Sequence, residues 1–596
     1  MSGNRRAVAL AVAAITLGGT GLAQVAGASP ATHWVSTATK ALTLHDVKLL
    51  DAPAAARPLH ISLALAPRDS SAVARAVKAT YTQGSSSYHR FITPAQWNAR
   101  FAPTATAVSK VTSYLRHAGF AHISVTSNRL LVSADASVAR VEQAFHTTLG
   151  SALINGVRRF LNVTPALVPS SLGGAVQAVL GLNDIPLSHA KLSLVKAAGP
   201  PALEAGLYPK QFNTTYHSAG THNGSKTAVA VMTEGDISGT ITSLRYAEHK
   251  EHAPRVPVTV VPVGPQSPDT SGADEFDMDS QVSTMVPGSV KRLYMYNIGS
   301  LVDTNIVAGV NSFVAQNQAR ALSASLGGCD LTAYLDGAMV ANDITLQEAA
   351  LQGQTFFASS GDNGAGCAFV AATGVPSGFP EANWPCSGEY TVCVGGTSLI
   401  ADAKGNRIAE LGWVGSGGGF SVAANPGFWT QDSDPLYEAN VVTGGRAVPD
   451  ISLDGDPNVA TPVKVYVGKT LSFVGGTSLS SPMMLGFWAR LESGHRNLLG
   501  FASPGLYGLY DAVNPGTSVT TPEVAITVVV PTLVPKPVPG LTDIVLGDNG
   551  PYPDLPGYDE VTGLGAPDVA ALNHVLKTPH LESKHTRPHP ARRTVR

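Results

Sequence analysis

A serine in a glycine-rich segment is the first side chain whose setting suits nucleophilic chemistry. Ser478 lies within residues 475–482, which read Gly-Gly-Thr-Ser-Leu-Ser-Ser-Pro. The glycines permit a sharp turn before the serine, and residues 483–491 are predicted to continue as a helix. Ser478 would then stand at a helix N-terminus, where unpaired N–H groups favour a developing negative charge. The alternative is that Ser478 only caps the helix.

A serine nucleophile also needs a base, and histidine is the usual one. The chain has no histidine between His252 and His495, and the tripeptide His-Gly-Thr does not occur in it. We therefore look for the base among other side chains.

Glu275 and Asp279 are the first candidates, in a segment that reads Asp-Glu-Phe-Asp-Met-Asp from residue 274 to 279. Because they are four residues apart, they share one face of a predicted helix. Two negative charges at that spacing are unfavourable in water, whereas a buried pair shares a proton and its two pKa values move apart. A solvated acidic face or a calcium loop is the alternative.

Asp362 is a third acidic candidate. It follows an apolar stretch, residues 355–358, and stands in the segment Ser-Ser-Gly-Asp-Asn-Gly at residues 359–364. In sheets of parallel strands, ligands and chemistry gather at the carboxyl ends of the strands. The alternative is an aspartate that caps a turn or a helix.

The elements that must position these side chains alternate along the second part of the chain. Short apolar runs are predicted as strands at residues 228–232, 292–298, 355–359 and 390–394, with helical stretches between them. This alternation predicts a parallel sheet covered by helices on both faces.

The first part of the chain, residues 58–187, reads as a smaller α/β unit. Its predicted elements are a strand at residues 59–65, helices at 105–118 and 138–149, and two short strands within 122–132. A linker is predicted between residues 187 and 208. Farther along, the Val/Pro-rich residues 520–541 are predicted to form an extended surface excursion.

Composition indicates a globular protein, and the N-terminal segment indicates export. Of 596 residues, 44% are hydrophobic and 14% charged, which excludes a disordered chain, and the net charge of −2 does not favour nucleic-acid binding.

Arg5 and Arg6 precede an apolar run and an Ala-Gly-Ala cleavage motif at residues 26–28, as in a secretory signal; an uncleaved anchor is the alternative. Export permits disulfides, and we expect two of them, with three possible pairings, among Cys329, Cys367, Cys386 and Cys393.

Together these motifs resemble the sedolisin family, the serine-carboxyl peptidases that include the kumamolisins and share a subtilisin-like fold. The matching segments, in the family's order, are residues 275–281, 360–364, 417–421, 446–452 and 476–482. The resemblance extends over nearly all of residues 59–567.

The resemblance implies a role for each candidate side chain. Ser478 would be the nucleophile and Glu275 the general base. Asp279 would orient Glu275, and Asp362 would donate a hydrogen bond to the tetrahedral oxyanion. A carboxylate with an ordinary pKa near ~4 is a useful base only in acid, and a carboxylic acid donates only while it is protonated.

The resemblance also implies a calcium ion and an activation domain. One structural Ca²⁺ would be bound by the carboxylates of Asp543 and Asp559 and the backbone oxygens of Ile544, Leu555 and Gly557, with ordinary turn aspartates as the alternative. Residues 88–94, Tyr-His-Arg-Phe-Ile-Thr-Pro, look like a segment of the kumamolisin propeptide. Acid would then release the activation domain by protonating its histidines, namely His89, His117, His122 and His146, and by neutralising the carboxylates that face them.

The predicted organisation is a signal peptide (1–28), an activation propeptide domain (29–195), a serine-carboxyl peptidase domain (196–576) and a basic disordered tail (577–596). The fold class is α/β, a subtilisin-like parallel sheet with flanking helices, preceded by a smaller α/β domain. The predicted protein is a secreted, monomeric, acid-acting endopeptidase. It cleaves protein or peptide substrates, is inhibited by its own propeptide, and has no nucleic-acid partner and no stable membrane insertion. An inactive secreted binding protein that kept the fold and a His-dependent subtilase are the alternatives.

Overall fold

The computed structural model describes residues 33–42, 47–186, 193–194, 206–367, 380–429, 445–458, 461–514 and 535–578. The predicted signal peptide, most of the linker, most of the Val/Pro-rich segment and nearly all of the basic tail lie outside these residues. A search of the described helices finds none with the length and apolar character needed to cross a membrane.

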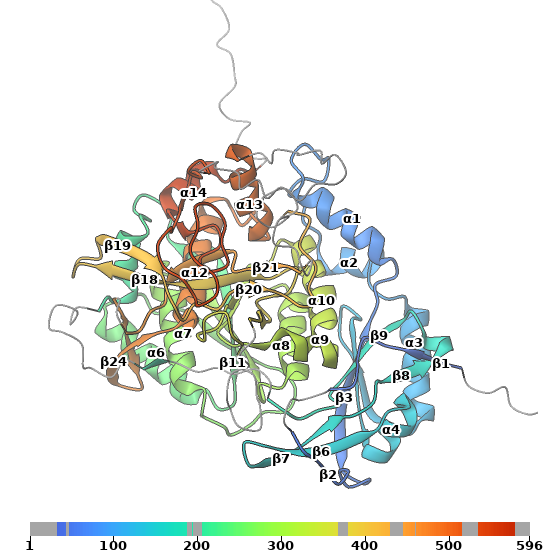
Figure 1. The fold of residues 1–596 in the computed structure, drawn as a ribbon. Helices are drawn as coiled ribbons and strands as arrows, with labels where there is room; N and C mark the ends of the chain where they lie inside the picture. The colour runs from blue at the N-terminus through green and yellow to red at the C-terminus, as the bar shows by residue number, and fades with distance from the viewer. Residues whose placement is uncertain are drawn as a thin grey trace, which may run out of the picture.

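An eight-stranded sheet forms the centre of the larger unit (Figure 1). In spatial order its strands are β12 (Val258–Pro262), β13 (Arg292–Ile298), β11 (Ala228–Glu234), β14 (Ala321–Ala324), β16 (Thr355–Ser359), β18 (Val392–Ala401) and β19 (Arg407–Gly412), and β22 (Ile451–Asp454) also pairs with β18. Every pairing is parallel except that of β18 with β19. The predicted parallel sheet is confirmed.

Helices cover both faces of this sheet. In β16, Phe357 contacts Trp488 of α12 (Thr477–Gly494), whereas Tyr296 of β13 contacts Phe313 of α8 (Asp303–Gln316). The strand register puts these two strand side chains on opposite faces. Helix α7 (Ala273–Met285) packs with α12, α6 (Ser238–Lys250) packs with α7, and α10 (Ala338–Gln352) packs with α8.

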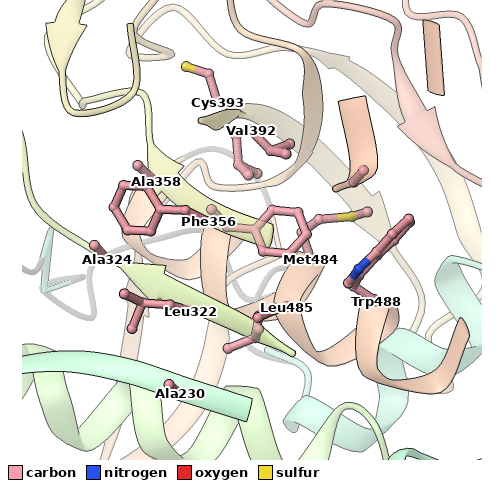
Figure 2. Close-up of a cluster of buried hydrophobic side chains, with 14 of the residues drawn as sticks. Ala230, Leu322, Ala324, Phe356, Ala358, Val392, Cys393, Met484, Leu485 and Trp488 are labelled. Atoms are coloured by element: carbon pink, nitrogen blue, oxygen red, sulfur yellow. The ribbon is translucent and has the colours of Figure 1, made fainter. Parts of the chain in front are cut away.

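The core lies between the sheet and these helices. Figure 2 shows part of it, to which the central strands contribute Leu322 and Phe356 and α12 contributes Met484 and Trp488, all of them buried. Burying apolar surface of this kind is the main favourable term in folding. It fixes α12, whose first turn carries Ser478, against the centre of the sheet.

The smaller unit is an antiparallel sheet backed by two helices. Its strand order is β4 (Ala121–Val125), β5 (Leu131–Ser137), β3 (Pro58–Leu65) and β9 (Val176–Leu180), and the helices are α3 (Ala105–His117) and α4 (Val138–Phe145). The prediction of a helix over residues 138–149 is wrong at its end. At His146 the backbone enters the left-handed region with φ 44°, which stops the helix, and Leu149 begins strand β6 (Leu149–Ile154).

The two units are packed against each other through the end of α1 (Ser70–Tyr81) and the segment after it. The Tyr81 hydroxyl donates to the carbonyl oxygen of Ala350 (2.7 Å) and accepts from the backbone N–H of Phe501 (2.8 Å). The Phe91 ring lies on Gly353, where φ is +71° and a Cβ atom would come within 2.5 Å of the ring. Only glycine suits this position, because both the backbone angle and the close approach exclude a side chain.

The described part of the linker lies beside a hairpin that leads to Ser478. The hairpin is β23 (Val463–Val467) and β24 (Thr470–Gly475), and it belongs to a small sheet separate from the central one. Strand β10 (Ser193–Leu194) pairs antiparallel with β24, and Leu207 forms a parallel bridge with Val463. The chain between the two units thus borders both edges of this hairpin.

Two disulfides join the four cysteines, Cys329 to Cys367 and Cys386 to Cys393. The expectation of two structural bridges is confirmed, and the structure selects one of the three pairings.

Candidate active site

Helix α7 carries the two predicted carboxyls on one face, and both are buried. Glu275 is 2% exposed and Asp279 is 0% exposed. The predicted helix is therefore confirmed, and the alternatives of a solvated acidic face and of a calcium loop are wrong. Burial is the main cause that raises the pKa of both side chains well above their ordinary values.

Ser478 occupies the second residue of α12 and is 7% exposed. Gly476, with φ +110°, is the N-cap, so the alternative that Ser478 caps the helix is wrong. Proximity to the Ser478 hydroxyl lowers the pKa of Glu275. Neither carboxyl oxygen of Glu275, however, has a hydrogen bond of ordinary length and angle to another described residue. The pKa of Glu275 is raised further by the nearby charges of Asp279 and Asp362.

Ser325, directly after β14, connects Asp279 with the serine. Its Oγ lies 2.7 Å from Oδ1 of Asp279 and 3.1 Å from the backbone carbonyl oxygen of Ser478, and the two acceptors share its single hydroxyl hydrogen. The side chain is 2% exposed, so water does not compete for these bonds. Nothing in the local sequence signalled Ser325, because its place depends on three segments that only the fold brings together.

Asp362 follows β16, as predicted, and is held by the residue that precedes Ser478. Its Oδ1 accepts from the backbone N–H of Thr477 (2.7 Å) and from the Thr477 hydroxyl (2.9 Å). The same hydroxyl accepts from the N–H of Gly361 (3.0 Å). A Cβ atom on Gly476 would come within 2.6 Å of Oδ2 of Asp362, so glycine lets the two loops approach. The structure therefore brings all four predicted side chains to one place.

The predicted metal ligands also lie together, in loops near the C-terminus. Both carboxylate oxygens of Asp543 accept from the N–H of Gly557 (3.2 and 3.0 Å), and Oδ2 of Asp559 accepts from the N–H of Leu555 (3.2 Å). Ile544 directly follows Asp543. One short loop, residues 555–557, thus connects both carboxylates.

The chemistry of this cluster fits a hard divalent cation. Among the described residues, no hydrogen bond ends on the backbone carbonyl oxygens of Ile544, Leu555 or Gly557. A third carboxyl, Asp554, has its pKa raised to about 6 by burial and by the negative charges of Asp548 and Asp543. Carboxylates together with unused carbonyl oxygens are the donors that Ca²⁺ prefers.

Comparison with known proteins agrees with this geometry. Residues 46–185 match the family described as "Pro-kumamolisin, activation domain". The chain is 32% identical to sedolisin from Pseudomonas sp. (strain 101) over 93% of its own length and 94% of that protein. It is 30% identical to xanthomonalisin from Xanthomonas sp. (strain T-22), covering 87% of this chain and 65% of that one.

A solved structure supports the same relationship. Pseudomonas sedolisin, a serine-carboxyl proteinase complexed with two molecules of pseudo-iodotyrostatin, aligns with a TM-score of 0.53 at 29% identity. The alignment covers 64% of this chain and 98% of that one. The fold is thus sedolisin- and subtilisin-like.

Similarity to peptidases over almost the whole length, with a separate activation domain ahead of the central sheet, makes this chain a serine-type peptidase zymogen. It belongs to the sedolisin family of serine-carboxyl peptidases.

Proposed function

We propose that the protein is a secreted endopeptidase that cleaves proteins in acid and matures by its own action. The observation that carries the proposal is the joint placement of four side chains. Glu275 and Asp279 are buried next to Ser478, and Asp362 is hydrogen-bonded to Thr477.

In the proposed reaction, Oγ of Ser478 attacks the carbonyl carbon of the scissile peptide bond while Glu275 takes the hydroxyl proton. A protonated Asp362 donates a hydrogen bond to the oxyanion of the tetrahedral intermediate. Glu275 then returns its proton to the leaving amine, which leaves an acyl-enzyme on Ser478. Water hydrolyses the acyl-enzyme by the same steps, and Glu275 again serves as the base.

Acid action follows from the proton requirements of these carboxyls. A close pair of carboxyls titrates in two steps that belong to the pair. In the form with one proton, Asp279 can hold the proton and Glu275 can act as a base. Asp362 can serve as a donor only while it is protonated, and loss of that proton would set the upper pH limit of activity.

The fold supports self-inhibition by the propeptide. The linker strand β10 pairs with β24, which ends at Gly475, three residues before Ser478. A linker beside the nucleophile is both a blocking segment and a possible substrate for the first cleavage. Export would follow from the predicted signal peptide, and we propose that the mature enzyme acts outside the cell.

We also propose one structural Ca²⁺ ion, held by Asp543, Asp559 and the carbonyl oxygens of Ile544, Leu555 and Gly557. When bound, the ion would neutralise the local negative charge and tie the C-terminal loops together. No step of the peptidase reaction depends on it.

The test is digestion of casein at about pH 4 and at pH 7, before and after incubation of the purified precursor in acid. We expect digestion at the acidic pH only, and only after incubation. A Ser478→Ala preparation, made in the same way, is the control for contaminating peptidases. Absence of digestion by the wild-type protein under all four conditions would contradict the proposal.

A further inference from the structure

The side of α7 away from Glu275 carries two buried polar residues that the proposed reaction does not use. Asp277 and Gln281 each lie two residues beyond a predicted catalytic carboxyl, about 200° farther round the helix. They are 3% and 1% exposed, respectively. Polar side chains at such depth need partners, because an unpaired polar group in the interior is costly.

Their partners belong to the hairpin of β23 and β24. Oε1 of Gln281 accepts from the backbone N–H of Tyr466 (2.9 Å), and Nε2 of Gln281 donates to the carbonyl oxygen of the same residue (2.8 Å). The side-chain amide thus pairs with Tyr466 as a neighbouring strand would. Asp277 adds a third bond one turn earlier, since its Oδ2 accepts from the N–H of Gly468 (2.8 Å).

This hairpin leads directly to the nucleophile. Strand β24 ends at Gly475, and Ser478 follows within the first turn of α12. The hairpin is not part of the central sheet and, among the described residues, is tied to it only near its two ends: the N–H of Thr461, before β23, donates to the carbonyl oxygen of Leu399 in β18 (2.7 Å), and the N–H of Gly476, after β24, donates to the carbonyl oxygen of Gly455, which follows β22 (2.5 Å). Helix α7 therefore holds the base on one side and, through Gln281 and Asp277, the end of β23 and the turn of the hairpin on the other.

We infer that Gln281 is a positioning residue for the peptidase reaction, which sets the place of Ser478 relative to Glu275 by holding the backbone of Tyr466. This inference rests on the proposed function. Bond formation by an enzyme nucleophile is sensitive to placement, and an error of 1 Å can reduce the rate by about 10²-fold. Gln281 reaches neither substrate nor reacting atoms and acts only through the hairpin.

The experiment uses the full-length chain, matured in acid, with wild-type enzyme added in trans and then removed where a variant matures slowly. Active sites are counted by titration, and kcat and KM are measured with one peptide substrate. Gln281→Leu keeps the volume and loses both hydrogen bonds to Tyr466, together with the bond from Nε2 to the backbone carbonyl oxygen of Asp277 on the same helix (2.8 Å). We expect its kcat to fall about 10- to 100-fold with KM unchanged.

Gln281→Glu gives a second readout that a loss of folding cannot imitate. A protonated carboxyl has one donor and one acceptor, as the amide does toward Tyr466, whereas a carboxylate has no donor. The ratio of its kcat to that of wild type should be near one in acid and should fall as pH rises.

The matched control is Gln354→Leu. Gln354 is also 1% exposed and donates to two backbone carbonyls, at Phe313 and Ala319, far from the hairpin. It should lose stability but keep kcat per active site.

The outcomes separate this inference from the proposed function. An inactive wild-type enzyme would overturn the proposed function itself. An active wild type with unchanged kcat in Gln281→Leu would overturn the positioning role. If Gln281→Leu does not fold, the decisive quantity is the kcat of Gln281→Glu divided by the kcat of wild type. A quotient that stays constant with pH overturns the positioning role, and a quotient that falls as pH rises supports it.

Discussion

Each side chain of the site owes its chemistry to its surroundings. Glu275 and Asp279 would be ordinary, ionised acids on a surface. Removed from water, each favours its neutral form, and each negative charge opposes the ionisation of the other. Ser325 acts against this trend, because its hydrogen bond to Asp279 lowers the pKa of that carboxyl. The result is a pair able to hold a proton and release it during reaction.

Ser478→Ala removes the nucleophile that forms the acyl-enzyme in the proposed reaction. The precursor should fold, remain uncut in acid and digest no casein, because no acyl-enzyme can form. Gel electrophoresis after acid incubation checks this. Turnover above that of a mock preparation would exclude Ser478 from the role.

Asp362→Asn tests oxyanion stabilisation. An amide still donates a hydrogen bond, but it cannot supply the acid proton and it presents different geometry to Thr477. We expect kcat to fall by about 10²–10³-fold, the cost of losing one oxyanion donor. Thr477 should keep the loop in place, so KM should change little. A variant with wild-type kcat would reduce Asp362 to a turn residue.

At the scale of elements, two helices meet at the site with three loops, namely those that follow β14 and β16 and the one that precedes α12. Helix α7 brings the carboxyls and α12 brings the serine, and both are fixed by packing against the central sheet. The position of Asp362 is fixed differently, by the hydrogen bonds from Thr477 and by the close approach of the two loops at Gly476. The C-terminal loops also pack into the core, through Ile544, Tyr558 and Leu564, and the proposed ion would compensate the negative charges of Asp543 and Asp559.

Asp543→Ala tests that compensation. It removes one carboxylate ligand, so the melting temperature should fall and should no longer respond to added calcium. The measurement is a melting curve with calcium and with chelator, for wild type and variant, on a Ser478→Ala background that prevents self-digestion. Identical melting curves in calcium and in chelator, for the protein that retains Asp543, would contradict the metal site.

At the scale of the whole molecule, the interface between the two units decides how acid could release the propeptide. Of the four histidines predicted to act, His89 lies against the larger unit, where burial lowers its pKa to about 4, although the nearby Leu498 backbone acts in the opposite direction. The other three contact propeptide residues; for example, His122 is bonded to Asp135 (2.8 Å) and His146 stacks on Trp34.

At the interface, Glu348 is a carboxyl whose protonation has the opposite effect from the predicted weakening of the contact. Asn128 of the propeptide donates to Glu348, whose pKa burial raises to about 8. Such a group is protonated more readily when docked, so acid strengthens its contact. His89 binds a proton more readily when undocked, so docking weakens as pH falls from about 6.5 toward 4. His89 is therefore the expected trigger.

We predict a precursor of full length at pH 7 that converts, below about pH 5, to a shorter form with a new N-terminus between residues 187 and 208. Activity should follow with a lag, and Glu275→Ala should block both. His89→Phe keeps an aromatic ring but cannot be protonated, so it should shift conversion to lower pH. Timed acidification with N-terminal sequencing measures both effects.

The exposed His117, bonded within its own helix, offers the matched control. His117→Gln should convert as the wild type does. Full activity of the uncut chain at pH 7 would contradict the zymogen mechanism, and equal conversion profiles for His89→Phe and wild type would exclude His89 as the trigger.

Buried carboxyls away from the site predict how stability depends on pH. Burial raises the pKa of Asp343 to about 8 and that of Glu492 to about 7. Their ordinary values are near 4, so their contribution to stability is fully present below about pH 4 and is lost as pH rises through 7 to 8. The melting temperature of the Ser478→Ala precursor should therefore be higher at pH 4 than at pH 8. A higher melting temperature at pH 8 would contradict this.

The sequence by itself determined the elements and the chemical types at the site. Hydrophobic runs predicted four strands of the central sheet, β11, β13, β16 and the start of β18, because a strand buried on both faces is apolar throughout. They did not predict β12, β14, β19 and β22. The spacing of Glu275 and Asp279 placed them on one helix face, and the absence of histidine over a long stretch directed attention to carboxyls.

The tertiary structure alone decided what depends on contacts between distant segments. Ser325 and Thr477 gained their partners only when loops far apart in sequence met, and the cysteine pairing was settled in the same way. The trigger among the propeptide histidines was also undetermined, because a side chain's pKa depends on burial and neighbours that local sequence does not encode. The helix predicted to end at residue 149 ends earlier, because the left-handed backbone of His146 changes the direction of the chain.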